Sequence, residues 1–256
     1  MGLLEKFGKA LDAGEAALLA KACEEAAADG RPRTTAFMDA ASVGAARQVL
    51  DEAAGIDARP FGGYRGAQRA KIAVAPAGFD WEGFDPSLGY ILIKGAQADP
   101  EETVAYVRAS GVAGSDIGDV FRTEGGIGAI VSAGAVARLL SKGVDIGGLP
   151  FEVVESDPTE LSFPGQARRE IKSTVNSMRL DAVAACGFPA SRTRLAQEIE
   201  IGRAKLNGRT VTDPSARVKQ GDTIVMRGRG RMIVEEEGPV TKKGRILLKI
   251  SKYSAL

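Results

Sequence analysis

The stretch of sequence that decides the fold runs over residues 178–231. It contains four pieces, MRLDAVAACGF (178–188), SRTRLAQEIEIG (191–202), KLNGRTV (205–211) and QGDTIVMR (220–227). In the first piece apolar residues recur at helical spacing, Asp181 is placed to cap a helix, and Gly187 is placed to end it in a left-handed C-cap. The first piece therefore predicts a short helix.

The next two pieces predict a second helix and a tight hairpin. Ser191 is the expected N-cap of a helix that turns Leu195 and Ile199 inward, which leaves arginines in the exposed first turn. The dipeptide Asn207-Gly208 indicates a hairpin because both turn positions favour positive φ. The fourth piece adds a turn and an alternating strand. Together the pieces predict two short helices followed by a small twisted sheet.

This arrangement, with arginines at the start of the second helix, resembles the RNA-binding module named after small-subunit ribosomal protein number four, here called the S-four-type module. A pair of arginines alone would fit a solvated helix face equally well. The match extends much further, and its residues are Arg179-Leu180-Asp181, Gly187, Ser191-Arg192, Ile199, Gly202, Asn207-Gly208, Val211, Pro214-Ser215, Val218 and Gly221-Asp222.

Charge is divided unevenly along the 256 residues, although the formal net charge is only +1. Residues 1–177 hold 18 Lys+Arg and 25 Asp+Glu, a net charge of −7, whereas residues 178–256 hold 16 and 8, a net charge of +8. Such asymmetry indicates that the C-terminal part meets a polyanion.

The composition excludes several classes of site. Histidine is absent, and the cysteines are Cys23 and Cys186. One chain therefore cannot build a Ser-His-Asp or Cys-His arrangement or a zinc site with the usual ligands, and we expect neither metal nor cofactor. Both cysteines are expected to be small core residues without a disulfide. No charge-free run of about 18 apolar residues occurs, so we expect a soluble protein without a membrane span.

The chain as a whole predicts an α+β fold in three parts. These are a helical N-terminal region (1–84), an α+β domain expected to bind RNA (85–165) and the S-four-type domain (178–256). Expected helices are 3–28, 39–54, 100–110 and 133–141, and expected strands are 72–75, 90–94, 120–122, 127–131 and 151–155. Residues 157–165 are the predicted linker, and residues 169–175 alternate like a strand.

A second candidate RNA contact lies at Tyr64, Arg65 and Arg69. Cations beside an aromatic residue and a flexible turn suit phosphate contacts and base stacking. A turn that leads into the strand at 72–75 explains the same residues equally well.

From about residue 31 onward, most of the chain resembles the YlmH family, including its cyanobacterial and plastid members. The resemblance is strongest to the photosynthetic branch, that of the photosystem II S-four domain protein. It rests on Phe61-Gly62-Gly63-Tyr64, Ala67-Gln68-Arg69, residues 115–120 and residues 228–245. It implies RNA as partner, either rRNA or tRNA on the large ribosomal subunit, in translation or ribosome-associated quality control. It also implies a monomer in the bacterial cytoplasm, or in the plastid stroma after removal of a targeting peptide.

Enzymes that carry an S-four-type module are the first competing class of function. S-four-type modules also occur in pseudouridine synthases, RNA methyltransferases and tyrosyl-tRNA synthetases, but the missing histidines, the small middle domain and the C-terminal position of the module fit none of them. We therefore expect no enzyme. The alternative is a scaffold factor in photosynthetic complex assembly or cell division.

The candidate RNA-binding residues share a positive charge or a place in an exposed turn of the module. They are Arg179, Ser191, Arg192, Thr193, Arg194, Arg203, Lys205, Asn207, Arg209, Arg227, Arg229, Arg231, Lys242 and Lys243. The arginines of the second helix and the cations of the following hairpin are expected to form one face.

Overall fold

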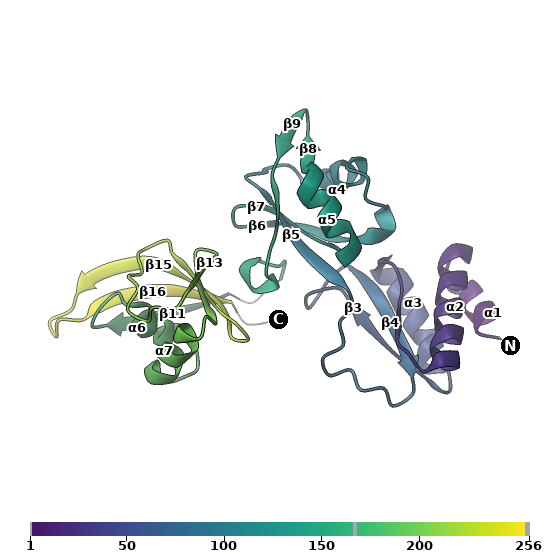
Figure 1. Ribbon diagram of the computed structural model, residues 1–256, viewed down its shortest axis with the longest axis horizontal. Coiled ribbons are helices and arrows are strands. Elements are labelled where there is room, and N and C mark those ends of the chain that lie inside the picture. Colours follow the sequence, from purple (N-terminus) through teal and green to yellow (C-terminus); the bar gives the residue numbers. More distant parts are fainter. Residues whose placement is uncertain (1, 166–167, 254–256) are drawn as a thin grey trace. The chain divides into compact units, whose positions relative to one another are not determined.

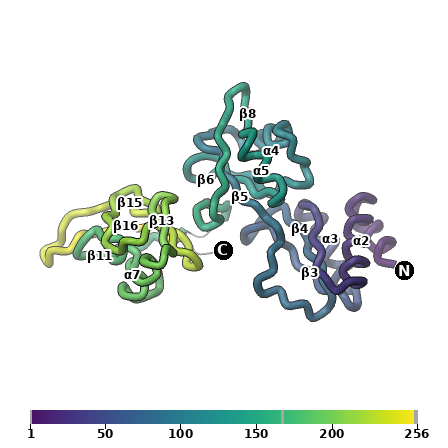
Figure 2. Tube along the Cα trace, in the orientation of Figure 1, coloured from purple at the N-terminus to yellow at the C-terminus, as the bar shows by residue number. Residues whose placement is uncertain are grey.

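The computed structural model describes residues 2–165 and 168–253 (Figure 1). These residues divide into two compact units, Met1–Ser156 and Asp157–Leu256. Figure 2 follows the chain through both units, from purple at the N-terminus to yellow at the C-terminus. The overall class is α+β, as predicted.

The first half of unit 1 packs helices on a sheet in which β4 is central. Its helices are α1 (Leu3–Gly8), α2 (Ala13–Asp29) and α3 (Ala40–Asp51), and its strands are β1 (Arg33–Thr34), β2 (Met38–Asp39), β3 (Ile56–Phe61) and β4 (Arg69–Pro76). Strand β4 pairs antiparallel with β1, β2 and β3. The region thus contains more strand than its sequence predicted, because β1 and β2 are too short to show a period and β3 contains a proline.

Apolar residues of β4 alternate between two layers. Ile72 and Val74 join the core beneath the helices, where Cys23 is also buried. Burial raises the pKa of the Cys23 thiol to about 11, as expected for a core residue. On the other face, Ala73 and Ala75 lie under a loop anchored by Trp81, whose Nε1 donates to Asp57 Oδ2 at 3.1 Å.

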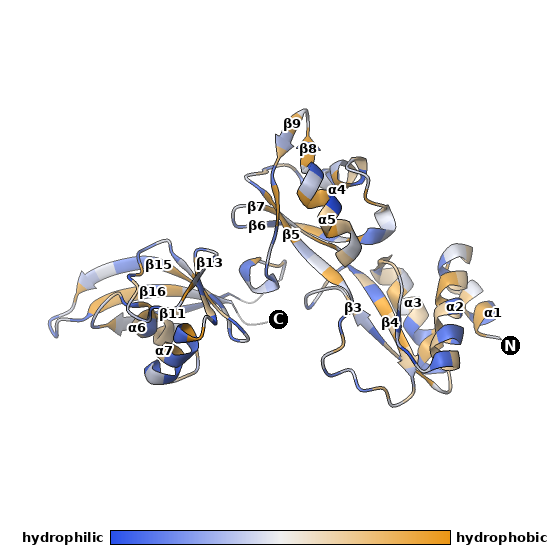
Figure 3. Ribbon diagram, viewed as in Figure 1, coloured by the Kyte–Doolittle hydropathy of each residue, from blue (hydrophilic) through white to orange (hydrophobic). Residues whose placement is uncertain are grey.

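The second half of unit 1 is an antiparallel sheet of order β10-β5-β7-β6 with helices α4 and α5. Its elements are β5 (Leu88–Lys94), α4 (Pro100–Ala109), a 3-10 turn (Gly114–Asp116), β6 (Ile117–Thr123), β7 (Gly126–Ser132), α5 (Ala133–Lys142), β8 (Val144–Ile146), β9 (Leu149–Phe151) and β10 (Val153–Glu155). Figure 3 shows β4 and β5 as predominantly hydrophobic strands. The expected helices 100–110 and 133–141 and the strands 90–94, 120–122 and 127–131 are present, whereas the expected strand 151–155 is divided between β9, which pairs with β8, and β10, which pairs with β5.

Unit 2 is an antiparallel sheet of order β11-β16-β15-β14-β12-β13, with helices α6 and α7 over one face (Figure 1). Its elements are a 3-10 turn (Pro158–Glu160), β11 (Arg168–Val175), α6 (Leu180–Gly187), α7 (Arg192–Glu200), β12 (Ala204–Leu206), β13 (Arg209–Val211), β14 (Thr223–Met226), β15 (Gly230–Val240) and β16 (Ile246–Tyr253). The helices bury Val183 and Leu195 against Met226, Met232 and Leu248.

The segment before β11 covers the opposite face of this sheet. Leu161 and Phe163 are buried, and Glu160 accepts at its carbonyl from Arg231 Nη1 at 3.4 Å. Arg231 is 2% exposed, donates to Ser162 Oγ and lies over the ring of Tyr253 at 4.3 Å. The predicted linker therefore contributes residues 157–163 to unit 2.

The structure confirms some of the helix caps and turns predicted for the module and contradicts others. Ser191 caps α7 by accepting from the Arg194 amide at 3.2 Å, and Asn207 and Gly208 have φ of 50° and 78°, so both predictions are confirmed. The cap assigned to Asp181 was wrong, because the N-cap of α6 is Arg179, two residues earlier, and the Asp181 side chain binds arginines.

The left-handed cap predicted at Gly187 was also wrong. Gly187 is the last residue of α6, and extended backbone follows at Phe188. A neighbour across the core lies close to this position: a Cβ on Gly187 would lie 2.4 Å from Met232 Sδ, so the methionine side chain or the helix would have to shift.

Candidate nucleic-acid interface

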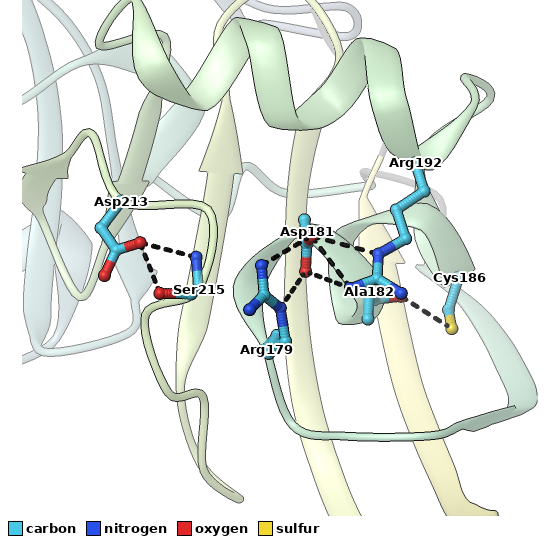
Figure 4. A network of polar contacts seen from close by, with 7 residues as sticks. All are labelled: Arg179, Asp181, Ala182, Cys186, Arg192, Asp213 and Ser215. Atoms are coloured by element: carbon cyan, nitrogen blue, oxygen red, sulfur yellow. Dashed lines mark hydrogen bonds and ion pairs between the residues drawn. The ribbon is translucent and has the colours of Figure 1, made fainter.

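A buried carboxylate holds two arginines at the start of the helix pair (Figure 4). Arg179 donates from Nε to Asp181 Oδ1 and from Nη2 to Oδ2, both at 3.2 Å. Arg192 donates from Nε to Oδ2 and from Nη2 to Oδ1, both at 3.1 Å. The Asp181 side chain is 7% exposed, whereas those of Arg179 and Arg192 are 43% and 49% exposed. The arrangement presents two guanidinium groups to solvent above one buried anion.

Electrostatics in this group favour the ionised carboxylate. Burial opposes ionisation of Asp181, but the hydrogen bonds from Arg179 and Arg192 outweigh it and hold the pKa of Asp181 below its ordinary value. The same contacts raise the pKa of Arg179. Asp181 and Arg179 therefore form a charged pair at neutral pH.

A second carboxylate repeats the arrangement on α7. Arg229 donates from Nη2 to Glu198 Oε1 at 2.7 Å and from Nε to Oε2 at 2.8 Å, and Arg194 donates from Nε to Oε1 at 3.3 Å. The side chains of Glu198, Arg229 and Arg194 are 10%, 18% and 69% exposed. The hydrogen bond from Arg229 lowers the pKa of Glu198, against the opposing effect of burial.

Further predicted cations adjoin these two groups. The Arg203 amide donates to the Glu198 carbonyl, and the Arg227 amide donates to the Arg203 carbonyl, both at 3.0 Å. Arg209 pairs across the hairpin with Leu206, which packs into the core under the helices, so both residues lie on the helix side of the sheet. Ser191 and Thr193 are exposed in the first turn of α7.

Sequence reasoning missed one cation at this surface. Arg217 is exposed and forms an antiparallel bridge with Arg179. It lies in an irregular segment without helix or strand period, so only the fold brings it beside the arginines of α6. We define the arginine face as the arginines that contacts or register bring to the side of α6 and α7: Arg179, Arg192, Arg194, Arg209, Arg217 and Arg229.

Other predicted residues lie elsewhere in unit 2. Lys205 stands between Ala204 and Leu206, which face the helices, so it points to the opposite face, where it pairs with Glu160 at 3.0 Å. Arg231 is buried on that same opposite face. The expectation that Lys205 joins one face with the α7 arginines therefore does not describe the fold.

Asn207 and the two lysines of the last turn are also apart from the arginine face. The Asn207 side chain ties its hairpin to the turn before β14, because it donates to Asp222 and accepts from the Thr223 amide, both at 2.9 Å. Lys242 and Lys243 occupy the tip of the long β15–β16 hairpin, which Figure 2 shows in yellow, away from α7. Both lysines are exposed.

Of the three candidate RNA contacts in unit 1, Tyr64 and Arg69 make hydrogen bonds within the fold. Asp119 accepts from Tyr64 Oη at 2.6 Å and from the Arg69 amide at 2.8 Å. The Arg69 guanidinium donates to the carbonyls of Ile117 and Phe37. Burial, followed by the bond to Asp119, raises the pKa of Tyr64. Arg65 is exposed.

The described part of the chain contains neither a metal-binding cluster nor a membrane-spanning helix. Within residues 2–165 and 168–253, no group of three or more His, Cys, Asp or Glu side chains is placed to hold a metal ion. No helix in the same ranges has the length and apolar character needed to cross a bilayer.

The arginine face lies largely within a stretch that matches a known family. The model of the S4 domain family matches residues 178–224, which include α6, α7 and the β12–β13 hairpin. Residues 178–224 form an S4 domain. Supporting this, the small ribosomal subunit protein uS4 of Trichlorobacter lovleyi is 46% identical over 56 residues, 22% of this chain and 27% of that protein.

Similarity also extends beyond the S4 domain. The ribosome-associated protein quality control protein P2 of Bacillus subtilis is 27% identical over 188 residues, 72% of this chain and 73% of its own length. The solved structure of the cell division protein ylmH from Streptococcus pneumoniae matches with a TM-score of 0.50 and 13% identity, over 58% of this chain and 93% of that one, which shows a shared fold. The predicted resemblance to YlmH-type proteins is confirmed. The cyanobacterial or plastid branch stays a prediction.

Proposed function

We propose that the S4 domain binds structured RNA through the arginine face, without catalysing a reaction on it. The observation that carries this proposal is the exposure of Arg179 and Arg192 above the buried Asp181, and of Arg194 above the buried Glu198. A guanidinium held at its inner edge still offers donors outward, and two such donors suit the non-bridging oxygens of a phosphate. Contacts of this kind read the backbone and shape of a folded RNA.

We further propose that the RNA is rRNA or tRNA on the large ribosomal subunit. Support for a ribosomal partner comes from the names of relatives, since the Bacillus subtilis protein is called ribosome-associated and the Trichlorobacter lovleyi protein is a small ribosomal subunit protein. The choice of the large subunit rests on the resemblance to the YlmH family. The charge of +8 on residues 178–256 suits a surface that approaches a large polyanion.

The direct test is the double variant Arg192→Ala, Arg194→Ala in the full chain. Asp181 keeps Arg179 and Glu198 keeps Arg229, so neither buried carboxylate is left without an arginine. We expect the fold to persist and the affinity for structured RNA to fall by roughly 1–3 kcal/mol, because charge-assisted contacts are lost. Binding is measured by filter retention or fluorescence anisotropy, and folding by thermal denaturation.

The matched control removes two positive charges from unit 1. Arg138→Ala, Lys142→Ala changes exposed residues of α5 and leaves the arginine face intact. It should bind RNA like the wild type and co-sediment with large subunits, whereas the arginine-face variant should not. Equal binding by both variants would refute the proposal, and co-sedimentation that survives nuclease treatment would indicate a protein partner instead.

A further inference from the structure

The arginine face carries two acids, which its proposed function does not explain. Asp181 and Glu198 sit beneath the surface that would meet RNA phosphates, where a negative charge lowers the attraction for a polyanion. Both are nearly buried, and burying a carboxylate is unfavourable unless it is paired and hydrogen-bonded. Each acid therefore needs a favourable role in RNA binding that outweighs the repulsion between its negative charge and the RNA.

The bonds to these acids engage a particular edge of each guanidinium. Arg179 and Arg192 bind Asp181 through Nε and Nη2, and Arg229 binds Glu198 in the same way. The Nη1 group of each takes no part in these bonds. Each of these guanidinium planes is fixed by a two-point contact, as Figure 4 shows for Arg179 and Arg192, which leaves the Nη1 donors available for another acceptor.

Fixing an arginine before RNA arrives changes the free energy of binding. A free arginine has large rotamer freedom, which it loses when it grips a phosphate. An arginine already held by a carboxylate has lost this freedom on folding. The negative charge of the carboxylate repels the RNA and so weakens binding, but salt screens this repulsion at a partly exposed surface. Asp181 holds both of its arginines by two-point contacts, so the ordering effect applies twice for that one negative charge. Glu198 holds Arg229 in this way and Arg194 by one bond at 3.3 Å.

We propose that Asp181 and Glu198 are positioning residues of the RNA-binding surface, which set the pairs Arg179–Arg192 and Arg194–Arg229 in the orientation that receives phosphates. This inference rests on the proposed RNA-binding function. It assigns to two acids a favourable role in binding an anion.

The test compares neutralisations that have the same charge change. Asp181→Asn and Glu198→Gln each raise the net charge by one, and so does the control Glu200→Gln, which changes an exposed residue of the same helix α7. We expect Asp181→Asn and Glu198→Gln in the full chain to bind a structured RNA roughly fivefold to tenfold more weakly. Glu200→Gln should bind equally or more tightly.

Salt dependence separates positioning from a general loss of fold. The slope of log affinity against log salt counts the phosphates neutralised. We expect a shallower slope for Asp181→Asn, although its net charge is higher, when binding is measured at a temperature below the melting transition of the variant. If all three neutralisations tighten binding alike, the inference is overturned.

A measurement on the unaltered chain covers the case in which a variant fails to fold. In NMR spectra, the slowly exchanging Nε–Hε signals of Arg179 and Arg192 should persist when RNA is added, since the carboxylate contacts remain in the complex. Their disappearance on binding would overturn the inference, because RNA would then be replacing the carboxylate.

The two proposals fail in different ways. If the Arg192→Ala, Arg194→Ala variant binds RNA normally, the proposed function itself fails. If that variant loses binding while Asp181→Asn and Glu198→Gln behave like Glu200→Gln, only the positioning role fails.

Discussion

Gly187 at the end of α6 lies directly beneath Met232 of β15, so close that a Cβ on Gly187 would stand 2.4 Å from the Met232 sulfur. Helix α6 can approach the sheet only because this position has no side chain. We predict that Gly187→Ala destabilises unit 2 by about 1–3 kcal/mol through overpacking. Denaturant unfolding measures the change, and Gly134→Ala in α5 is the control, since a Cβ there meets nothing within 4 Å.

For Gly134, which lies in open space, substitution by alanine should change the free energy of unfolding in the opposite direction. Alanine at position 134 is expected to stabilise by roughly 0.5–1 kcal/mol, the usual difference in helix propensity. Equal and small effects of both substitutions would show that Met232 moves aside without cost.

Acid should weaken the fold through Asp181. Its pKa in the folded state lies below the ordinary value of 3.8, so the ionised carboxylate stabilises the fold above that pH, and the contribution is lost as the pH falls through the folded pKa. We predict that Asp181→Asn is less stable than the wild type by about 1–3 kcal/mol at pH 7. Melting curves at several pH values should converge below pH 3.8, and a gap that stays constant down to pH 2 would contradict this.

The boundaries of unit 2 predict which fragment folds. Strand β11 pairs with β16 along its whole length, and Leu161 and Phe163 are buried before it begins. A fragment of residues 157–256 should therefore unfold cooperatively at a higher temperature than a fragment of residues 178–256, which lacks both features. Circular dichroism melts compare the two, and identical transitions would show that β11 and the preceding segment add nothing.

In unit 1, Asp119 should matter for stability and not for RNA binding. It is 8% exposed and accepts from Tyr64 Oη and from the amides of Gln68 and Arg69. We expect Asp119→Ala to cost about 2–4 kcal/mol, because several buried donors lose their acceptor, while Tyr64→Phe should cost about 1 kcal/mol. Thermal unfolding measures both, and unchanged RNA affinity is the accompanying expectation.

Several features of the S4 domain follow from short stretches of sequence. A capping side chain at Ser191, an apolar stripe through Leu195 and Ile199, and the turn at Asn207-Gly208 depend on φ/ψ preferences and on neighbours within a few residues. The charge difference between the two parts of the chain is likewise a property of the sequence alone. These features were sufficient to indicate the helix pair, the hairpin and the resemblance to a family.

The partners of individual side chains depended on strand register and on contacts between residues far apart in the chain. Sequence alone indicated a charged Asp181 at a helix start, but only the docking of α7 beside α6 brings Arg192 to its carboxylate, 11 residues later. The register of β12 turns Lys205 away from the helices, and the covering segment buries Arg231 beside Ser162, 69 residues earlier. Local preferences operate over a few bonds, whereas these contacts form only when the sheet is complete, so the tertiary structure alone decided which cations remain exposed together.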